Sequence, residues 1–155
     1  MKHIQGSSTG KVGIDLGVVI SAAVFDGTNY EAVQFLTKAA VKSKKLSKKL
    51  DKSLSRKQYG SHRYEKALLL KQRRELRSTN QRKAALEEYT TWLVKNYHEI
   101  VIDDFSFKSV LKINNADKKT HEKLYTSMAY QFKLRLEEKA KACGAIVRYV
   151  EHLKG

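Results

Sequence analysis

Two aspartates end apolar segments that have the composition of buried strands. Asp15 follows Val12-Gly13-Ile14, and Asp103 follows Val101-Ile102. If these strands are neighbours in one sheet, the two carboxylates face one another across roughly 5 Å. Clustered carboxylate oxygens suit Mg²⁺ or Mn²⁺, and two such ions held about 3.5–4 Å apart can hydrolyse a phosphodiester. The aspartates therefore predict a divalent-metal site. A capping or solvated role is the alternative for either residue.

The strands that must position these acids alternate with helical segments. The turn signal Asp26-Gly27 and two short connections favour an antiparallel meander of the first three strands. Helical crossovers before and after 98–105 place the last two strands parallel to the first. The predicted strands cover residues 11–17, 18–27, 29–36, 98–105 and 145–150.

Helical periodicity predicts two long helices, about 38–57 and 62–97, joined at Gly60. In the second helix, leucines and Tyr97 form an approximate heptad stripe that includes Leu69 and Leu76. A later helix ends at Cys143-Gly144. Its stripe predicts core packing, and its members are Leu124, Met128, Phe132, Leu136 and Ala140.

Positive charge is concentrated in one part of the chain. The whole sequence carries 31 Lys and Arg against 16 Asp and Glu, a net charge of +15. Residues 36–83 hold 17 of these cations and three acids. Such an excess favours a polyanion, with nucleic acid preferred over a membrane surface. No apolar run approaches the roughly 20 residues that span a bilayer. The residues predicted to bind nucleic acid are Lys42, Lys44, Lys45, Lys48, Lys49, Lys52, Arg56, Lys57, Arg63, Arg73, Arg74, Arg77 and Arg82.

Six short motifs occur in an order that resembles one protein family. They are Gly13-Ile14-Asp15-Leu16-Gly17, Phe25-Asp26-Gly27, Leu54-Ser55-Arg56-Lys57, Asn80-Gln81-Arg82-Lys83, Ile100-Val101-Ile102-Asp103-Asp104-Phe105 and Lys139-Ala140-Lys141-Ala142-Cys143-Gly144. Together they resemble the RuvC-like nuclease domain of TnpB, the transposon-encoded RNA-guided endonucleases related to type V CRISPR effectors. The resemblance covers roughly residues 11–151. It implies an α/β, RNase H-like fold: a five-stranded mixed sheet in the order 3-2-1-4-5 with an inserted basic helical hairpin at 38–97.

The resemblance also implies roles for individual acids. Asp15 matches the first catalytic acid of the family. Asp103 stands where the family has a glutamate, and Asp104 matches a following aspartate with a structural role. The family continues into a four-cysteine zinc ribbon and a third catalytic aspartate. This chain is expected to lack both, and Glu151 is a poor substitute for the third acid.

The resemblance also implies a function. The family is a Mg²⁺-dependent DNA endonuclease, whereas this chain alone is expected to hold Mg²⁺ or Mn²⁺ weakly, to contain no zinc site and to be inactive. DNA and a guide RNA are the expected partners, with no membrane, in a prokaryotic cytoplasm associated with the nucleoid. Residues 1–10 are read as a linker or cloning remnant, and 11–155 as one domain.

Two alternatives to this function remain. A non-catalytic nucleic-acid-binding module derived from such a nuclease is the first. A sugar-kinase or actin-like ATPase fragment is weaker, because no second glycine-rich segment like 13–17 occurs.

The remaining conspicuous residues have simpler interpretations. The single cysteine, Cys143, excludes an internal disulfide and is expected to be buried. Tyr89, Trp92 and Tyr97 are expected to pack against the sheet. Tyr59 and Tyr64, near the hairpin tip, are candidates for base stacking, with simple packing as the alternative. Accordingly, the aromatic residues divide into a core set and a hairpin set.

Overall fold

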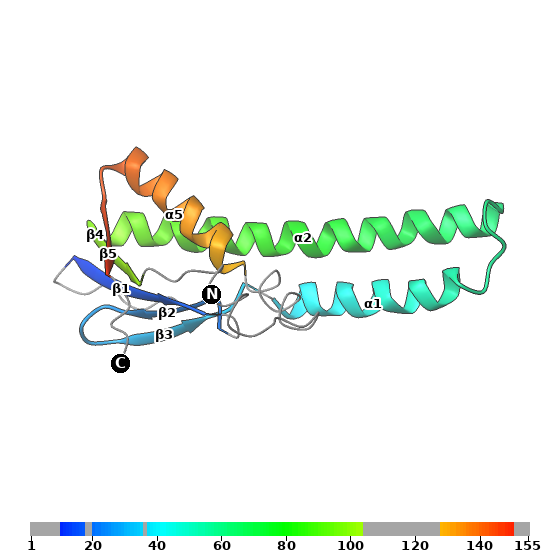
Figure 1. Ribbon diagram of the computed structural model, residues 1–155, viewed down its shortest axis with the longest axis horizontal. Coiled ribbons are helices and arrows are strands. Elements are labelled where there is room, and N and C mark those ends of the chain that lie inside the picture. The colour runs from blue at the N-terminus through cyan, green and yellow to red at the C-terminus, as the bar shows by residue number, and fades with distance from the viewer. Residues whose placement is uncertain (1–9, 18–19, 36, 104–127, 151–155) are drawn as a thin grey trace. The chain divides into compact units, whose positions relative to one another are not determined.

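The computed structural model describes residues 10–17, 20–35, 37–103 and 128–150. Within these ranges the chain forms five strands and three helices, shown in Figure 1. They are β1 (Lys11–Leu16), β2 (Ala22–Phe25), β3 (Tyr30–Val33), α1 (Lys38–Leu54), α2 (His62–Asn96), β4 (Glu99–Asp103), α5 (Ala129–Cys143) and β5 (Ile146–Val150). The contacts divide the chain into two compact units, 1–35 with 86–155, and 36–85. The expectation of a single domain over 11–155 stays a prediction.

The strands form one mixed sheet in the order β3-β2-β1-β4-β5, which confirms the predicted α/β fold and strand order. The β1–β2 and β2–β3 pairs are antiparallel, and the β1–β4 and β4–β5 pairs are parallel. The turn between β2 and β3 forms as its residues predict. The Asp26 Oδ1 atom accepts hydrogen bonds from the Thr28 and Asn29 amides at 2.9 and 2.7 Å, and Gly27 has a φ of +95°. The hydrogen bonds from these two backbone amides, that of Asn29 first, hold the pKa of the Asp26 carboxyl below its usual value.

One face of the sheet packs against helices. Alternate residues of β1 and β4 are buried, and α5 and the end of α2 lie on the same side of the sheet (Figure 1). An aromatic cluster fills the space, since the Phe132 ring centroid lies 5.3 Å from Phe35 and 6.2 Å from Tyr89. Tyr89 and Tyr97 are fully buried and Trp92 is half-buried, which confirms their predicted packing role.

The second unit, described from 37 to 85, is an antiparallel helical hairpin. The Thr37 hydroxyl caps α1 by accepting from the Ala40 amide, and Gly60 turns the chain with a φ of +74°. The seam between the helices is polar. Its contacts are Ser47 Oγ to Glu75 Oε1 at 2.9 Å, Lys71 Nζ to Asp51 Oδ1 at 2.7 Å, and Ser78 Oγ to the Ala40 carbonyl at 3.1 Å.

The expectation that Cys143 is buried is wrong. Cys143 is exposed, because it is the last residue of α5 and borders an open depression lined by Tyr97 and His98. The heptad stripe of α2 is buried only in its C-terminal part. Leu69 and Leu76 are 49% and 61% exposed, because α1 packs on another side of α2. Leu124 of the α5 stripe lies outside the described residues, and the remainder of that stripe is buried as predicted.

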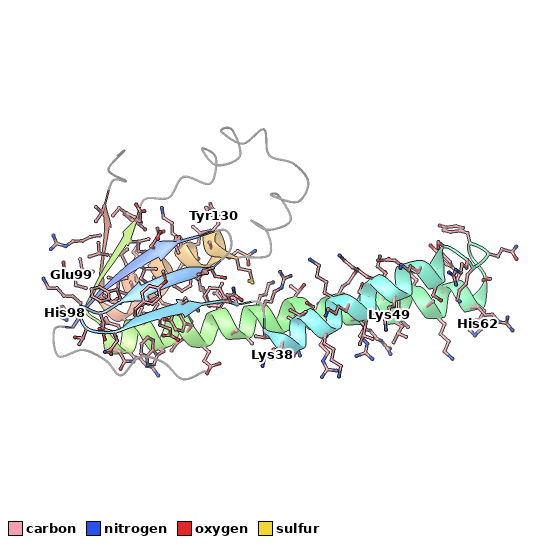
Figure 2. The ribbon with its side chains drawn as sticks, turned by 90° about the horizontal axis from the view of Figure 1, so that it is seen from below. Lys38, Lys49, His62, His98, Glu99 and Tyr130 are labelled. Atoms are coloured by element: carbon pink, nitrogen blue, oxygen red, sulfur yellow. The ribbon has the colours of Figure 1, made fainter. Side chains whose placement is uncertain are left out.

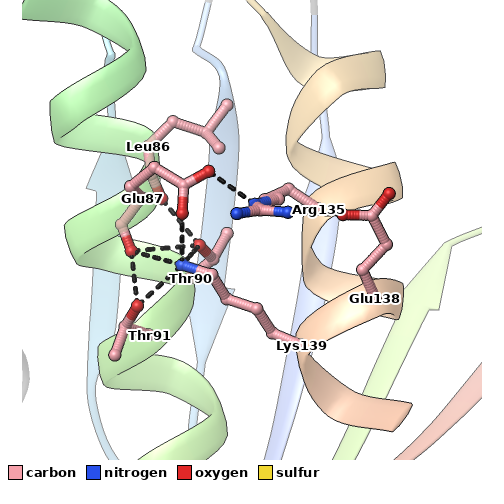
Figure 3. A network of polar contacts seen from close by, with 7 residues as sticks. All are labelled: Leu86, Glu87, Thr90, Thr91, Arg135, Glu138 and Lys139. Carbon is pink, nitrogen blue, oxygen red and sulfur yellow. Dashed lines mark hydrogen bonds and ion pairs between the residues drawn. The ribbon is translucent and has the colours of Figure 1, made fainter. Parts of the chain in front are cut away.

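A polar network joins α2 to α5 at the edge of the core (Figure 3). The Lys139 ammonium donates to the Thr90 and Thr91 hydroxyls at 2.9 and 2.6 Å, and lies 2.8 Å from Glu87 Oε2. Arg135 Nε contacts Glu87 Oε1 at 2.5 Å. Hydrogen bonds from Arg135, and then from Lys139, hold the pKa of Glu87 below its usual value.

This network makes part of the stability dependent on pH. Because the folded pKa of Glu87 lies below the ordinary 4.5, its contribution is present above that value and is lost as the pH falls through the folded pKa. We expect Glu87→Gln to lower the unfolding free energy at neutral pH. The difference from wild type should shrink as the pH falls below 4.5. Urea unfolding at a series of pH values measures it. The matched control is Glu88→Gln, an exposed neighbour; an equal pH dependence in both variants would contradict the assignment.

Candidate functional site

Asp15 lies on the face of the sheet that the described helices do not cover. Along β1, Val12, Ile14 and Leu16 are buried, and the side chains between them point the other way. Asp15 is exposed and pairs in register with Ala23 of β2. The alternation that buries the apolar side chains therefore also fixes where this carboxylate points.

The parallel pairing of β1 with β4 brings Asp103 beside Asp15. The register runs from Lys11 opposite Glu99 to Ile14 opposite Ile102, so the next residues along each strand are the two aspartates. Ile102 is buried and Asp103 only half-buried, which puts Asp103 on the same face as Asp15. Neighbouring strands lie about 4.8 Å apart. The predicted adjacency of the two strands is thus present in the sheet.

Small side chains flank the two aspartates. Ala23 stands beside Asp15 on β2, and Val150 pairs with Asp103 on β5. Further along the same face, Phe25 and Tyr30 pair across β2 and β3 and are 50% and 64% exposed. Sequence reasoning used Phe25 only as a turn marker. The alternation of β2, with Val24 buried, is the signal that would have placed Phe25 on the face of Asp15.

Glu99, a further carboxylate on this face, is paired with two basic side chains. Glu99 contacts Lys11 Nζ and Arg148 Nε, each at 3.0 Å. The hydrogen bond from Lys11 is the main reason that the pKa of Glu99 lies below its usual value. Glu99 also lies at the opposite end of β4 from Asp103. Glu99 therefore forms structural ion pairs that link β1, β4 and β5.

The two aspartates have the donor chemistry of a hard divalent cation. Carboxylate oxygens are the side-chain ligands that Mg²⁺ and Mn²⁺ accept, and neither ion needs a complete protein cage because water completes its shell. Over residues 10–17, 20–35, 37–103 and 128–150, no group of three His, Cys, Asp or Glu side chains is arranged to hold a metal. Asp104 and Glu151 lie outside these ranges. The donor set described thus fits one ion, bound with few protein ligands.

Gly17, two residues after Asp15, has a steric role. A Cβ atom on Gly17 would lie 2.7 Å from the Ile20 carbonyl oxygen, too close for any other residue. A Cβ atom on Gly13 would meet only the Phe25 carbonyl oxygen, at an ordinary 3.7 Å. Gly17 therefore permits the tight bend after β1, whereas Gly13 leaves open space beside the carboxylates.

The hairpin exposes most of the predicted basic residues. Figure 2 shows long side chains with nitrogen tips along α1 and the first part of α2, including Lys49. Nine of the thirteen are exposed: Lys42, Lys45, Lys48, Lys49, Lys52, Arg56, Arg63, Arg73 and Arg77. The other four are part-buried: Lys44, Lys57, Arg74 and Arg82. Lys57, which follows α1, donates to Ser53 Oγ in the last turn of that helix at 3.0 Å.

The aromatic residues at the hairpin tip are accessible. Tyr59 is 85% exposed, and its ring centroid lies 5.1 Å from that of the part-buried Tyr64. A role in base stacking stays a prediction for both. None of the helices in the described part of the chain combines the length and apolar composition needed to cross a bilayer.

Comparison with known structures agrees with this fold. The chain is similar to Cas12f1 in a structure titled as the Cas12f1–sgRNA–target DNA complex, with a TM-score of 0.50 and 16% sequence identity. The match covers 91% of this chain and 28% of the Cas12f1 chain, so the protein spans less than a third of that relative. The fold is RNase H-like, with the five-stranded order 3-2-1-4-5 of the sheet described above.

Comparison with protein families identifies the chain. Residues 5–114 match the OrfB_IS605 family, described as a probable transposase. The chain belongs to this family, the TnpB family that the motifs resemble. No curated protein matches its sequence.

The contrast between the two glycines gives a direct test of the geometry beside Asp15. We expect Gly17→Ala to lower the unfolding free energy by about 1–3 kcal/mol, because the added methyl group forces the Ile20 carbonyl to move. Gly13→Ala should change it by less than about 1 kcal/mol, since alanine loses less entropy than glycine in a strand. Chemical denaturation of both variants measures the difference. Equal losses of unfolding free energy in Gly17→Ala and Gly13→Ala would contradict a special steric role of Gly17 beside the Ile20 carbonyl.

Proposed function

We propose that this protein is a RuvC-like, metal-dependent nuclease core that binds nucleic acid through its helical hairpin. The parallel register of β1 and β4, which sets Asp15 beside Asp103 on one sheet face, is the observation that carries the proposal. Membership of a transposase family and an RNase H-like fold support it. The intact protein would cleave DNA, and this chain contributes the carboxylate pair.

Asp15 and Asp103 would hold Mg²⁺ or Mn²⁺. When bound, such an ion polarises a phosphodiester oxygen and activates a water molecule for attack. Asp15 is the more important ligand in this proposal, because it is exposed on the central strand with space over Gly13. Asp103 is one methylene shorter than the family's glutamate, which reduces its reach by about 1.5 Å. We therefore expect weak metal binding, and little or no cleavage, from this chain alone.

Exposed cations of the hairpin would hold the nucleic-acid backbone. Lys45, Lys48, Lys49 and Lys52 lie on the side of α1 away from the buried Ser43 and Ser47. Each lysine that neutralises a phosphate releases a counterion, which makes the affinity depend on salt. DNA and a guide RNA are the proposed partners. Support comes from the family and from Cas12f1, whose structure contains an sgRNA and target DNA.

A non-catalytic nucleic-acid-binding module is the second candidate. The observation that favours it is the donor set, because the described residues supply two carboxylates, and two-metal hydrolysis requires ligands for both ions. The two candidates share the hairpin and differ only in whether the carboxylate pair holds metal.

The hairpin proposal predicts binding with a steep salt dependence. Replacing Lys45, Lys48, Lys49 and Lys52 with glutamine should lower the magnitude of the slope of log K against log salt by about 3–4 for duplex DNA. Affinity in low salt should fall by about tenfold or more. Fluorescence anisotropy with a labelled duplex over a salt series measures both.

The control must show that the loss of affinity and of salt dependence is due to the lysines of α1. The double variant Lys95→Gln and Lys141→Gln removes exposed cations from the first unit and should leave the slope nearly unchanged. Thermal midpoints should stay close to wild type, because exposed substitutions usually change stability by less than about 0.5 kcal/mol. Affinity that does not depend on salt, or equal losses in both variants, would contradict the proposal.

A further inference from the structure

The side of α2 that faces away from α1 differs chemically from the rest of the hairpin. Seam residues Lys71, Glu75 and Ser78 contact α1. At 3.6 residues per turn, a second set of α2 residues lies about 150° around the helix from that seam. This second set lines a shallow depression of about 430 Å³ and consists of Arg73, Leu76, Arg77, Asn80, Gln81 and Ala84. We call this set the arginine–leucine face.

The arginine–leucine face is accessible and carries no negative charge. Arg73, Leu76, Arg77 and Asn80 are all exposed, and Leu76 is 61% exposed. Between Lys66 and Ala84 the single acid is Glu75, which is engaged at the seam by Ser47 and Lys71. A second copy of this face would bring like charges together, so charge complementarity favours an anionic partner.

Gln81 is part-buried, and within the described part of the chain its amide oxygen lacks a hydrogen-bond partner. Its Oε1 atom is inaccessible to solvent and has no hydrogen-bond partner among the described residues. A buried acceptor of this kind is destabilising unless a donor reaches it. Because Gln81 is itself only part-buried, a change of its side-chain rotamer can present this oxygen to the exocyclic amino groups of bases, which are donors that suit a carboxamide oxygen.

The types of residue on this face are those that contact base edges. Arginine forms paired hydrogen bonds with guanine, asparagine and glutamine form them with adenine, and alkyl groups contact the thymine methyl. The exposed stripe of α1, by contrast, is made of lysines, which bind phosphate without reading sequence. The two faces therefore have different recognition chemistry.

We propose that the arginine–leucine face of α2 enters the major groove of duplex DNA and contacts base edges, as a second nucleic-acid surface distinct from the lysine stripe of α1. This inference rests on the proposed function and deepens it. The twelve residues from Arg73 to Ala84 span about 16 Å of helix, the length of about five base pairs. A helix with side chains is about 10–12 Å across, which fits the roughly 12 Å major groove of B-form DNA. The A-form groove of duplex RNA is too narrow for it.

The two surfaces point in opposite directions. Lys45, Lys48, Lys49 and Lys52 lie about 160° around α1 from the buried residues Ala40, Ser43 and Ser47 that face the seam. The arginine–leucine face points away from the seam on the other helix. One straight duplex cannot contact both surfaces, so their contributions to binding are separable.

Selection from a randomised duplex library, followed by sequencing of the bound fraction, tests the proposal. The wild-type chain should prefer its best sequences over the average by about tenfold or more. The double variant Asn80→Ala and Gln81→Ala should lose that preference, and Asn80→Ala alone, a change at an exposed position, should reduce it. Gln72→Ala is the matched control, because Gln72 is an exposed amide on α2 outside the depression and should leave the preference intact. Lys45→Gln with Lys49→Gln should weaken all sequences alike and retain the preference.

The outcomes separate this inference from the proposed function. A wild-type chain that binds every duplex equally, with a steep salt dependence, would overturn the base-reading face and leave the nuclease-core proposal standing. A stronger preference for duplex RNA, or displacement of the duplex from this face by an acidic amphipathic helix, would overturn the assignment to duplex DNA. Failure to bind any nucleic acid would overturn both proposals.

Discussion

The parallel pairing of β1 with β4 is the constraint on which the sheet and its candidate site depend. Parallel strands need a long crossover, and the chain between β1 and β4 supplies it with two further strands and two helices. The register sets Ile14 beside Ile102 in the core. A slip of one residue would move Asp103 into the core and Ile102 out of it, at a cost that excludes the alternative. The packing that stabilises the sheet thus also fixes the two carboxylates on its other face.

The hairpin is stabilised by different interactions from those of the sheet, and this difference explains its surface. Its seam includes small serines and an ion pair, with Lys71 between Asp51 and Glu75 and the pKa of Lys71 raised mainly by the hydrogen bond to Asp51. Two of the three acids in residues 36–83 are used there. Most of the cations are consequently left at the surface, as lysines on α1 and as arginines on α2. Because the seam pairs two of the three acids of the hairpin with Lys71, the exposed cations form a positively charged surface that can bind nucleic acid.

Much of this arrangement was predictable, because it follows from local pattern. The strand-end aspartates and the Asp26-Gly27 turn depend on alternation and short connections that the sequence displays, whereas the β1–β4 pairing was expected from the helical crossovers and the family resemblance. Burial at the ends and sides of helices was not predictable. Cys143 continues the apolar stripe of α5 but lies where the helix ends, and Leu76 continues a heptad that α1 does not cover. Which side of a helix is covered depends on its neighbour, and the polar seam through Ser47 and Ser78 has no apolar signal to reveal it.

Titration with Mn²⁺, followed by electron paramagnetic resonance of the free ion, tests the carboxylate pair most directly. The wild-type chain should bind Mn²⁺ weakly, and Asp15→Asn and Asp103→Asn should each lower the affinity by about tenfold or more. The matched control is Glu99→Gln, which removes a carboxylate from the same sheet face but from the far end of β4, and should leave Mn²⁺ binding unchanged. Equal Mn²⁺ affinity in the wild type and both aspartate variants would contradict a metal site at Asp15 and Asp103.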